Sequence, residues 1–197
     1  MNNNIITTKC VIVGNAGVGK TALCHRLAGE EFRLMPNTIG VDYHKIKTAS
    51  RMLAIWDTAG AERFRNIVST YFDQGTVVLV AFSLETISTL YSVPQWMKDV
   101  RQVNRDCTFV VVGCKSDRRV VEETQIRQVL ASRGIDAPYV ECSAKIDTPG
   151  ELRARLVGVF PPMEAFQIEE PGRRASGKKR SASRPREHYY CPGCRVS

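Results

Sequence analysis

Short apolar runs separated by amphipathic stretches fill the chain between residues 9 and 160. The apolar runs are rich in β-branched residues, a composition that favours strands. Two of them, 77–83 and 108–114, contain almost no polar residue, as is typical of strands covered on both faces. The pattern predicts strands over residues 10–13, 41–48, 52–56, 77–83, 108–114 and 139–142.

Amphipathic stretches between these strands predict helices over residues 21–29, 94–103, 122–133 and 149–160. The last of them begins after Thr148, and Glu151 three residues later completes the pattern of a capping box. Strands 41–48 and 52–56 are close enough to form a hairpin, whereas the others alternate with helices. This order favours an α/β fold in which a six-stranded, mostly parallel sheet carries helices on both faces.

The composition favours one globular domain followed by a tail. The chain is 43% hydrophobic and 24% charged, which suits a packed core with a hydrated surface. No stretch of about eighteen apolar residues predicts a membrane span, and the polar N-terminus lacks the apolar core of a signal peptide. Seven cysteines, mostly in apolar segments, favour a reducing compartment. We therefore expect a cytoplasmic protein with a flexible N-terminus over 1–8, a domain over 9–162 and a disordered tail over 163–197.

A glycine-rich loop follows the first predicted strand and leads into the first predicted helix. Residues 14–21 match G-x-x-x-x-G-K-S/T, the pattern of a P-loop that binds nucleotide phosphates. Its glycines let backbone N–H groups approach the phosphates, Lys20 reaches the β- and γ-phosphates, and the Thr21 hydroxyl ligates Mg²⁺. An incidental glycine turn is disfavoured, because the strand and the helix stand where the motif requires them. The predicted phosphate-binding residues are Gly14, Asn15, Ala16, Gly17, Val18, Gly19, Lys20, Thr21 and Ala22.

A second motif, Asp57-Thr58-Ala59-Gly60, follows the predicted strand that ends at Trp56. An aspartate at a strand end is well placed to bind Mg²⁺ through water, and the N–H of Gly60 can contact a γ-phosphate. By itself such a sequence is more often only a turn. Its position downstream of the P-loop favours a role in the same nucleotide site.

Three segments add a specific family resemblance. Residues 38–43, 55–65 and 141–145 resemble the first switch, the third motif with the second switch, and the fifth motif of Rab-branch small GTPases in the Ras superfamily. The resemblance covers roughly residues 9–160 and implies a small G-protein domain of the P-loop NTPase class that binds GTP or GDP with Mg²⁺ and acts as a switch in vesicle traffic. It also implies a monomer whose effectors, exchange factors and GTPase-activating proteins contact residues 33–75.

The resemblance assigns roles to individual residues. Phe32 would lie on the guanine ring, Lys115 would pack along it, and the N–H of Ala144 would donate to guanine O6. Asp117 would accept from guanine N1–H and N2–H₂, an arrangement that adenine, whose N1 is an acceptor, does not offer. Thr38 would contact the γ-phosphate and Mg²⁺ in the GTP state. The resemblance implies that Gly60 faces the γ-phosphate and that Mg²⁺ is held by Thr21, Thr38 and Asp57. The implied base-binding residues are Phe32, Cys114, Lys115, Asp117, Ser143, Ala144 and Lys145.

Three features depart from the family pattern. Ala61 stands where the family usually has a glutamine that orients the attacking water, so we expect very slow intrinsic hydrolysis and assign no catalytic residue. Cys114 replaces an asparagine that contacts the base and the P-loop, so we expect weaker nucleotide binding and faster release. The hairpin between Val41 and Asp57 is several residues shorter than in typical Rabs, so partner identity does not carry over. The alternatives are a pseudo-GTPase that acts as a persistently GTP-bound scaffold or decoy for Rab effectors and, more distantly, an ATP-using P-loop enzyme.

The tail carries nearly all of the net charge of +8, since eight residues after Pro171 are basic and only Glu187 opposes them. Cys194, three residues before the last residue, loosely fits a prenylation motif, and Cys191 offers a second lipid site. A lipid combined with a basic stretch can anchor a protein to an anionic membrane, so we expect peripheral association with the cytosolic face. There are two alternatives for the tail. Cys191 and Cys194 could supply two of the four ligands of a zinc site, or residues 178–180 could bind nucleic acid or an import receptor. We do not expect nucleic acid as a partner.

Overall fold

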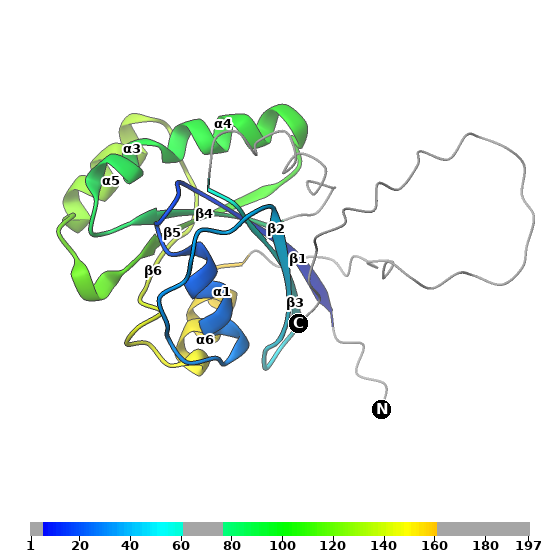
Figure 1. Cartoon of the computed structure of the whole chain (residues 1–197). Helices are drawn as coiled ribbons and strands as arrows, with labels where there is room; N and C mark the ends of the chain where they lie inside the picture. The colour runs from blue at the N-terminus through cyan, green and yellow to red at the C-terminus, as the bar shows by residue number, and fades with distance from the viewer. Residues whose placement is uncertain (1–5, 61–76, 161–197) are drawn as a thin grey trace, which may run out of the picture.

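The computed structural model describes residues 6–60 and 77–160, which form a sheet between two layers of helices (Figure 1). The strands are β1 Thr7–Val13, β2 Val41–Lys47, β3 Met52–Thr58, β4 Val77–Ser83, β5 Thr108–Cys114 and β6 Tyr139–Cys142. The α-helices are α1 Lys20–Ala28, α3 Ile87–Tyr91, α4 Val93–Val103, α5 Glu123–Ser132 and α6 Pro149–Gly158, and a short 3₁₀ helix, η3, spans Ser116–Arg118.

The strands form one six-stranded sheet in the order β2-β3-β1-β4-β5-β6. Strands β2 and β3 pair antiparallel as a hairpin, and the other neighbours pair in parallel. The predicted α/β fold with a mostly parallel six-stranded sheet is therefore confirmed. Because the parallel strands share one direction, their carboxyl ends meet at one edge of the sheet, where ligands bind in open α/β sheets.

The sheet separates two apolar cores, because successive side chains of a strand point to opposite faces. In β1, Cys10 and Ile12 belong to the core beneath α1 and α6, whereas Val11 and Val13 belong to the core beneath α3, α4 and α5. Figure 1 shows α1 and α6 on one side of the sheet and the other three helices on the opposite side. The central strands β4 and β5 supply apolar side chains to both cores, which explains their nearly unbroken apolar sequence.

The elements agree with the predicted pattern except at some boundaries and at one helix. Strand β1 begins at Thr7, inside the segment expected to be flexible, because it pairs with β3 from Met52 onward. Strand β3 continues to Thr58, which places Asp57 inside the strand. Helix α3 was absent from the predicted set, since five residues are too few to show a helical period. No helix in the described part of the chain is both long and apolar enough to cross a membrane.

The predicted capping box of α6 is present. The Thr148 side chain accepts from the N–H of Glu151 at 3.3 Å, and the Glu151 carboxylate accepts from the N–H of Thr148 at 2.9 Å. These bonds satisfy backbone donors that the first turn of a helix leaves free.

We expect Thr148→Ala to lower the free energy of unfolding by about 1 kcal/mol, because the substitution removes the capping oxygen. Thr148→Ser is the matched control, since serine keeps that oxygen and should unfold like the natural chain. Chemical denaturation of the three proteins measures the difference. Equal stability of the alanine and serine variants would contradict the role of the cap.

Candidate functional site

The loop between β1 and α1 has a backbone that only glycine accommodates. Gly14, Gly17 and Gly19 have φ angles of 143°, 74° and 112°. A Cβ atom on Gly14 would lie 2.1 Å from the carbonyl oxygen of Ala81 on β4, so the loop is held directly against the neighbouring strand. Gly19 is the N-cap of α1 and supplies no side-chain hydrogen bond, which leaves the first N–H groups of the helix available to an anion.

Lys20 lies beneath this loop. Its side chain is buried, and its Nζ donates to the carbonyl oxygens of Gly14 and Asn15, both at 2.9 Å. Burial lowers the pKa of Lys20, and the nearby Asp57 carboxylate opposes the shift. The loop therefore combines a cation, a helix N-terminus and exposed backbone donors, an arrangement suited to phosphate groups.

Three oxygen-bearing side chains meet beside Lys20. The Thr21 hydroxyl donates to Oδ2 of Asp57 at 2.6 Å and lies 2.6 Å from the hydroxyl of Thr38. The remaining oxygen of Asp57, Oδ1, is buried and has no hydrogen-bond partner among the described residues. Hydroxyl and carboxylate oxygens are ligands that Mg²⁺ prefers, so the residues present fit this ion. Burial raises the pKa of Asp57 to about 6, against the opposing effects of the Thr21 hydrogen bond and the Lys20 charge.

Gly60 lies against the P-loop. A Cβ atom at this position would be 2.5 Å from the amide nitrogen of Ala16 and 2.6 Å from Nζ of Lys20, so no side chain fits. The start of the predicted second switch is thus in direct contact with the loop that should hold phosphates. Ala61, the next residue, lies outside the described residues, as do residues 62–76 of the predicted partner-binding segment.

Two adjoining pockets follow the loop. One, of about 570 Å³, extends from the P-loop to the segment that carries Thr38. The other, of about 370 Å³, lies over β5 and β6. Both are lined by Gly19, Phe32 and Lys115, so they meet at the P-loop. The second pocket brings together the predicted base-binding residues Phe32, Cys114, Lys115, Asp117, Ala144 and Lys145.

A hydrogen-bond network shapes the floor of the smaller pocket. The Ser143 hydroxyl donates to Oδ1 of Asp117 and accepts from the N–H groups of Lys145 and Ile146. The N–H of Ser143 donates to Asp147 at 2.8 Å. Ser143 does not itself line the pocket; it orients the carboxylate and the loop that do. The site therefore contains a fixed acceptor, Asp117, in a largely apolar slot.

Sequence reasoning missed four residues that hold the base-side loops. Glu85 pairs with Lys115 at 3.0 Å and with Arg118 at 2.9 Å. Asp147 receives Arg155 at 3.0 Å in addition to the N–H of Ser143. No local sequence pattern indicates the pairs of Glu85, because its partners lie about thirty residues further along the chain.

Cys114 occupies the boundary between the base pocket and the P-loop. A Cβ atom on Gly19 would lie 3.4 Å from the Cβ atom of Cys114, so the two segments are in contact. The Cys142 thiol donates to the Cys114 sulfur at 3.9 Å, and both side chains are buried. A thiol is a weaker hydrogen-bonding group than an amide, so the contact between the two loops here is mainly one of packing.

The parallel sheet, the loop after β1 and the pockets at the strand ends define a P-loop nucleotide-binding domain. A sequence model of the Ras family matches residues 9–151. The chain is 36% identical over 148 residues to Ras-related protein Rab-36 of Homo sapiens and of Mus musculus, an alignment that covers 70% of this chain and 55% of each relative. It is 31% identical over 194 residues to Ras-related protein Rab-1D of Dictyostelium discoideum, covering 88% of this chain and 94% of that protein. The chain therefore belongs to the Ras family and is a Rab-like small GTPase by sequence. It spans about half the length of the Rab-36 proteins.

We expect Cys114→Asn to slow the release of GDP about two- to tenfold. An amide can bridge the base pocket and the P-loop with a hydrogen bond worth about 0.5–1.5 kcal/mol that the thiol does not make. Dissociation of a fluorescent GDP analogue measures the rate. Cys107→Ser is the control and should leave release unchanged, because Cys107 lies just before the first residue of β5 whereas Cys114 is the last residue of that strand. Unaltered release from Cys114→Asn would contradict this explanation.

Proposed function

We propose that this chain is a GTP/GDP-dependent molecular switch in vesicle or membrane trafficking. The observation that carries the proposal is the joining of the two pockets at the P-loop. One is lined by Lys20 and by Thr21, whose hydroxyl donates to the buried Asp57, groups suited to phosphates and Mg²⁺, and the other is lined by Asp117. A guanine nucleotide has chemistry to match both parts.

In this proposal the nucleotide phosphates lie along residues 14–22, and Thr21, Thr38 and Asp57 hold Mg²⁺, Asp57 through water. The ion would neutralise phosphate charge when bound. Lys20 contributes a second positive charge, and Asp117 accepts from the guanine edge. Phe32 and Lys115, which line both pockets, cover the junction between base and phosphates.

The switch itself depends on Thr38 and Gly60. The segment that carries Thr38 has almost no core contacts, since Leu34 is 91% exposed and Ile39 is 88% exposed. A segment with few buried contacts is held weakly and can be released at small free-energy cost. A γ-phosphate that binds Thr38 and the N–H of Gly60 would hold both loops, and its loss would free them.

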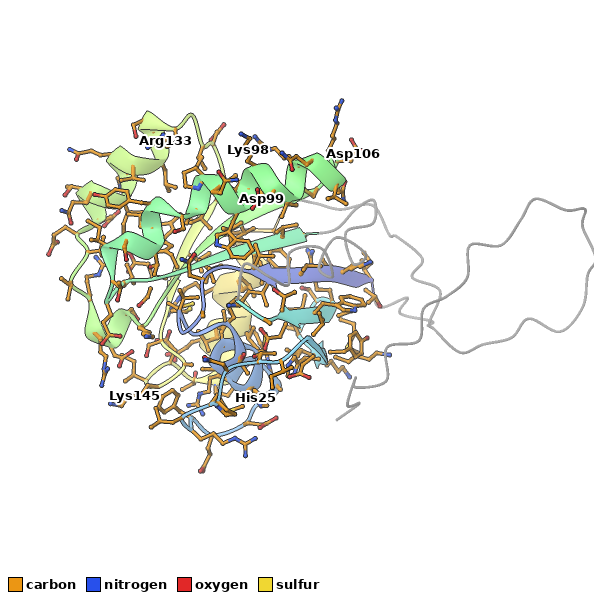
Figure 2. All side chains as sticks on the ribbon, turned by 45° about the horizontal axis from the view of Figure 1, so that its top comes forward. His25, Lys98, Asp99, Asp106, Arg133 and Lys145 are labelled. Carbon is orange, nitrogen blue, oxygen red and sulfur yellow. The ribbon has the colours of Figure 1, made fainter. Side chains whose placement is uncertain are left out.

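Selection of guanine provides the test of this function. We expect the natural protein to bind GDP and GTP in preference to ATP, and Asp117→Asn to lower GDP affinity at least about tenfold, because charged hydrogen bonds contribute about 1.5–3 kcal/mol each. Competition titrations against fluorescent GDP measure both. Asp106→Asn is the control, since Asp106 lies after α4, far from Lys145 at the pocket (Figure 2). Equal affinity for ATP and GTP would reject the proposal and favour an ATP-using enzyme.

Hydrolysis is proposed to be very slow without an activating protein, because Ala61 has no group to orient the attacking water. A second candidate function follows from the same residue. A chain that binds GTP but barely hydrolyses it would act as a persistent scaffold or decoy for Rab effectors. Ala61 and Cys114 are the two features that favour this pseudo-GTPase.

We expect Ala61→Gln to raise single-turnover GTP hydrolysis at least roughly tenfold, because the amide restores the group that positions water. Ala49→Gln in the exposed β2–β3 turn is the matched control and should leave the rate unchanged. Both proteins are loaded with GTP and phosphate release is followed, with and without candidate activating proteins. A natural chain that already hydrolyses GTP at the rate of the glutamine variant would contradict the assignment.

The tail is proposed to tether the domain to the cytosolic face of an anionic membrane. Cys194 and Cys191 are the proposed lipid sites and the basic residues after Pro171 the second signal. These residues lie outside the described part of the chain. The proposed organisation is a short N-terminal segment, a nucleotide-binding domain to residue 162 and the basic tail. In this proposal the domain is a monomer whose partners read residues 33–75.

A further inference from the structure

Three potential metal ligands from different elements converge under the first helix. Cys24 lies on α1, His44 on β2 and Asp57 on β3. A thiol sulfur, an imidazole nitrogen and a carboxylate oxygen of these residues all lie within 4.8 Å of one another, and all three side chains are buried.

The register of the hairpin explains why they meet. Asp57 pairs with Asp42 and Ile55 pairs with His44, so Asp57 and His44 are diagonal neighbours on one face of the hairpin. That face packs on α1, because Ile46, Leu53 and Ile55 share a core with Cys24. A cysteine on the inner face of α1 therefore points toward both side chains.

Two atoms of this cluster lack the partner that burial normally requires. Nε2 of His44 and Oδ1 of Asp57 are buried without a hydrogen-bond partner among the described residues. The neighbouring His25 does not satisfy His44: their rings meet edge-on with centroids 5.2 Å apart, and Nδ1 of His25 pairs with Glu30 at 2.8 Å. Unpaired buried polar atoms are rare, and a bound ion is one recognised explanation.

We propose that Cys24, His44 and Asp57 form a binding site for a zinc-like divalent transition-metal ion. Thiolate, imidazole and carboxylate are the usual protein ligands of Zn²⁺. Tetrahedral ligands at 2.0–2.3 Å from an ion lie about 3.3–3.8 Å apart, so small side-chain rotations close the cluster around it. Binding releases the thiol proton of Cys24 to solvent as the metal–sulfur bond forms, and water completes the fourth position.

This site differs in chemistry from the magnesium site although it shares Asp57. The magnesium-side contacts of Asp57 run through Oδ2 to the hydroxyl of Thr21, and that set contains only oxygen. Mg²⁺ favours such oxygen ligands, whereas a thiolate and an imidazole favour Zn²⁺ or Co²⁺. The ion would join α1 to the β2–β3 hairpin.

Titration with Co²⁺ tests the proposal, because a thiolate ligand gives a charge-transfer absorption that an oxygen-only site does not. The full chain is used with Cys191→Ser and Cys194→Ser, which removes the Cys-Pro-Gly-Cys sequence as a competing thiol site. In this background we expect one equivalent of Co²⁺ with the charge-transfer band, displaced by Zn²⁺. Zinc should also raise the melting temperature, since an ion that binds only the folded state stabilises it.

Variants of the cluster decide the outcome. Cys24→Ser should abolish the band and the zinc-dependent rise in melting temperature, and His44→Gln should weaken Co²⁺ binding at least tenfold. Cys10→Ser, another buried cysteine of the same core, is the matched control and should bind as before. Absence of the band in the tail-substituted chain, or its survival in Cys24→Ser, would overturn the proposal. Should Cys24→Ser not fold, unchanged Co²⁺ affinity in folded His44→Gln overturns it as well.

Discussion

A buried carboxylate, that of Asp57, connects the parts of this molecule that have to act together. It stands near the end of β3, accepts from Thr21 on α1, and through that hydroxyl meets Thr38 in the segment before β2. Burial raises its pKa to about 6 even though the Thr21 hydrogen bond and the Lys20 charge oppose the shift, so these neighbours help the carboxylate to remain charged near neutrality. On the phosphate side, Lys20 and Thr21 stabilise the charge of Asp57. On the side of Cys24 and His44, the proposed transition-metal ion would stabilise it. The two proposed ion sites would therefore share this carboxylate as a ligand.

At Cys114 the departure from the family pattern falls on a single interaction while the surrounding geometry of the base pocket is retained. Cys114 removes an amide at the contact between the base pocket and the P-loop, yet that loop remains held by other bonds. Lys115 pairs with Glu85, Asp117 receives Ser143, and the N–H of Ser143 is fixed by Asp147. The pocket is therefore shaped by several independent contacts. We therefore expect changes at Cys114 and Ala61 to affect how long a nucleotide stays bound and how fast it is hydrolysed more than whether the pocket forms.

Stability and the proposed switching are located in different parts of the structure. The helices and the sheet enclose two apolar cores, whereas the chain between α1 and β2 contributes exposed apolar side chains such as Leu34 and Ile39. These side chains flank Thr38, whose hydroxyl lies 2.6 Å from that of Thr21 on α1. An exposed segment of this kind can change conformation with the bound nucleotide without disturbing the cores, and a partner protein would detect that change.

The sequence by itself determined the strands and the P-loop motif, because strand patterning and glycine spacing are local properties that a few neighbouring residues encode. It placed the capping box at Thr148 and the strand limits of β4, β5 and β6 for the same reason. The base-binding residues and Thr38 were implied only by the family resemblance. Only the tertiary structure decided which distant side chains meet. The pairing of Glu85 with Lys115 and the convergence of Cys24, His44 and Asp57 depend on how strands order in the sheet and how α1 packs on the hairpin. Such contacts join residues far apart along the chain, so the periodicity of apolar residues in the sequence does not predict them.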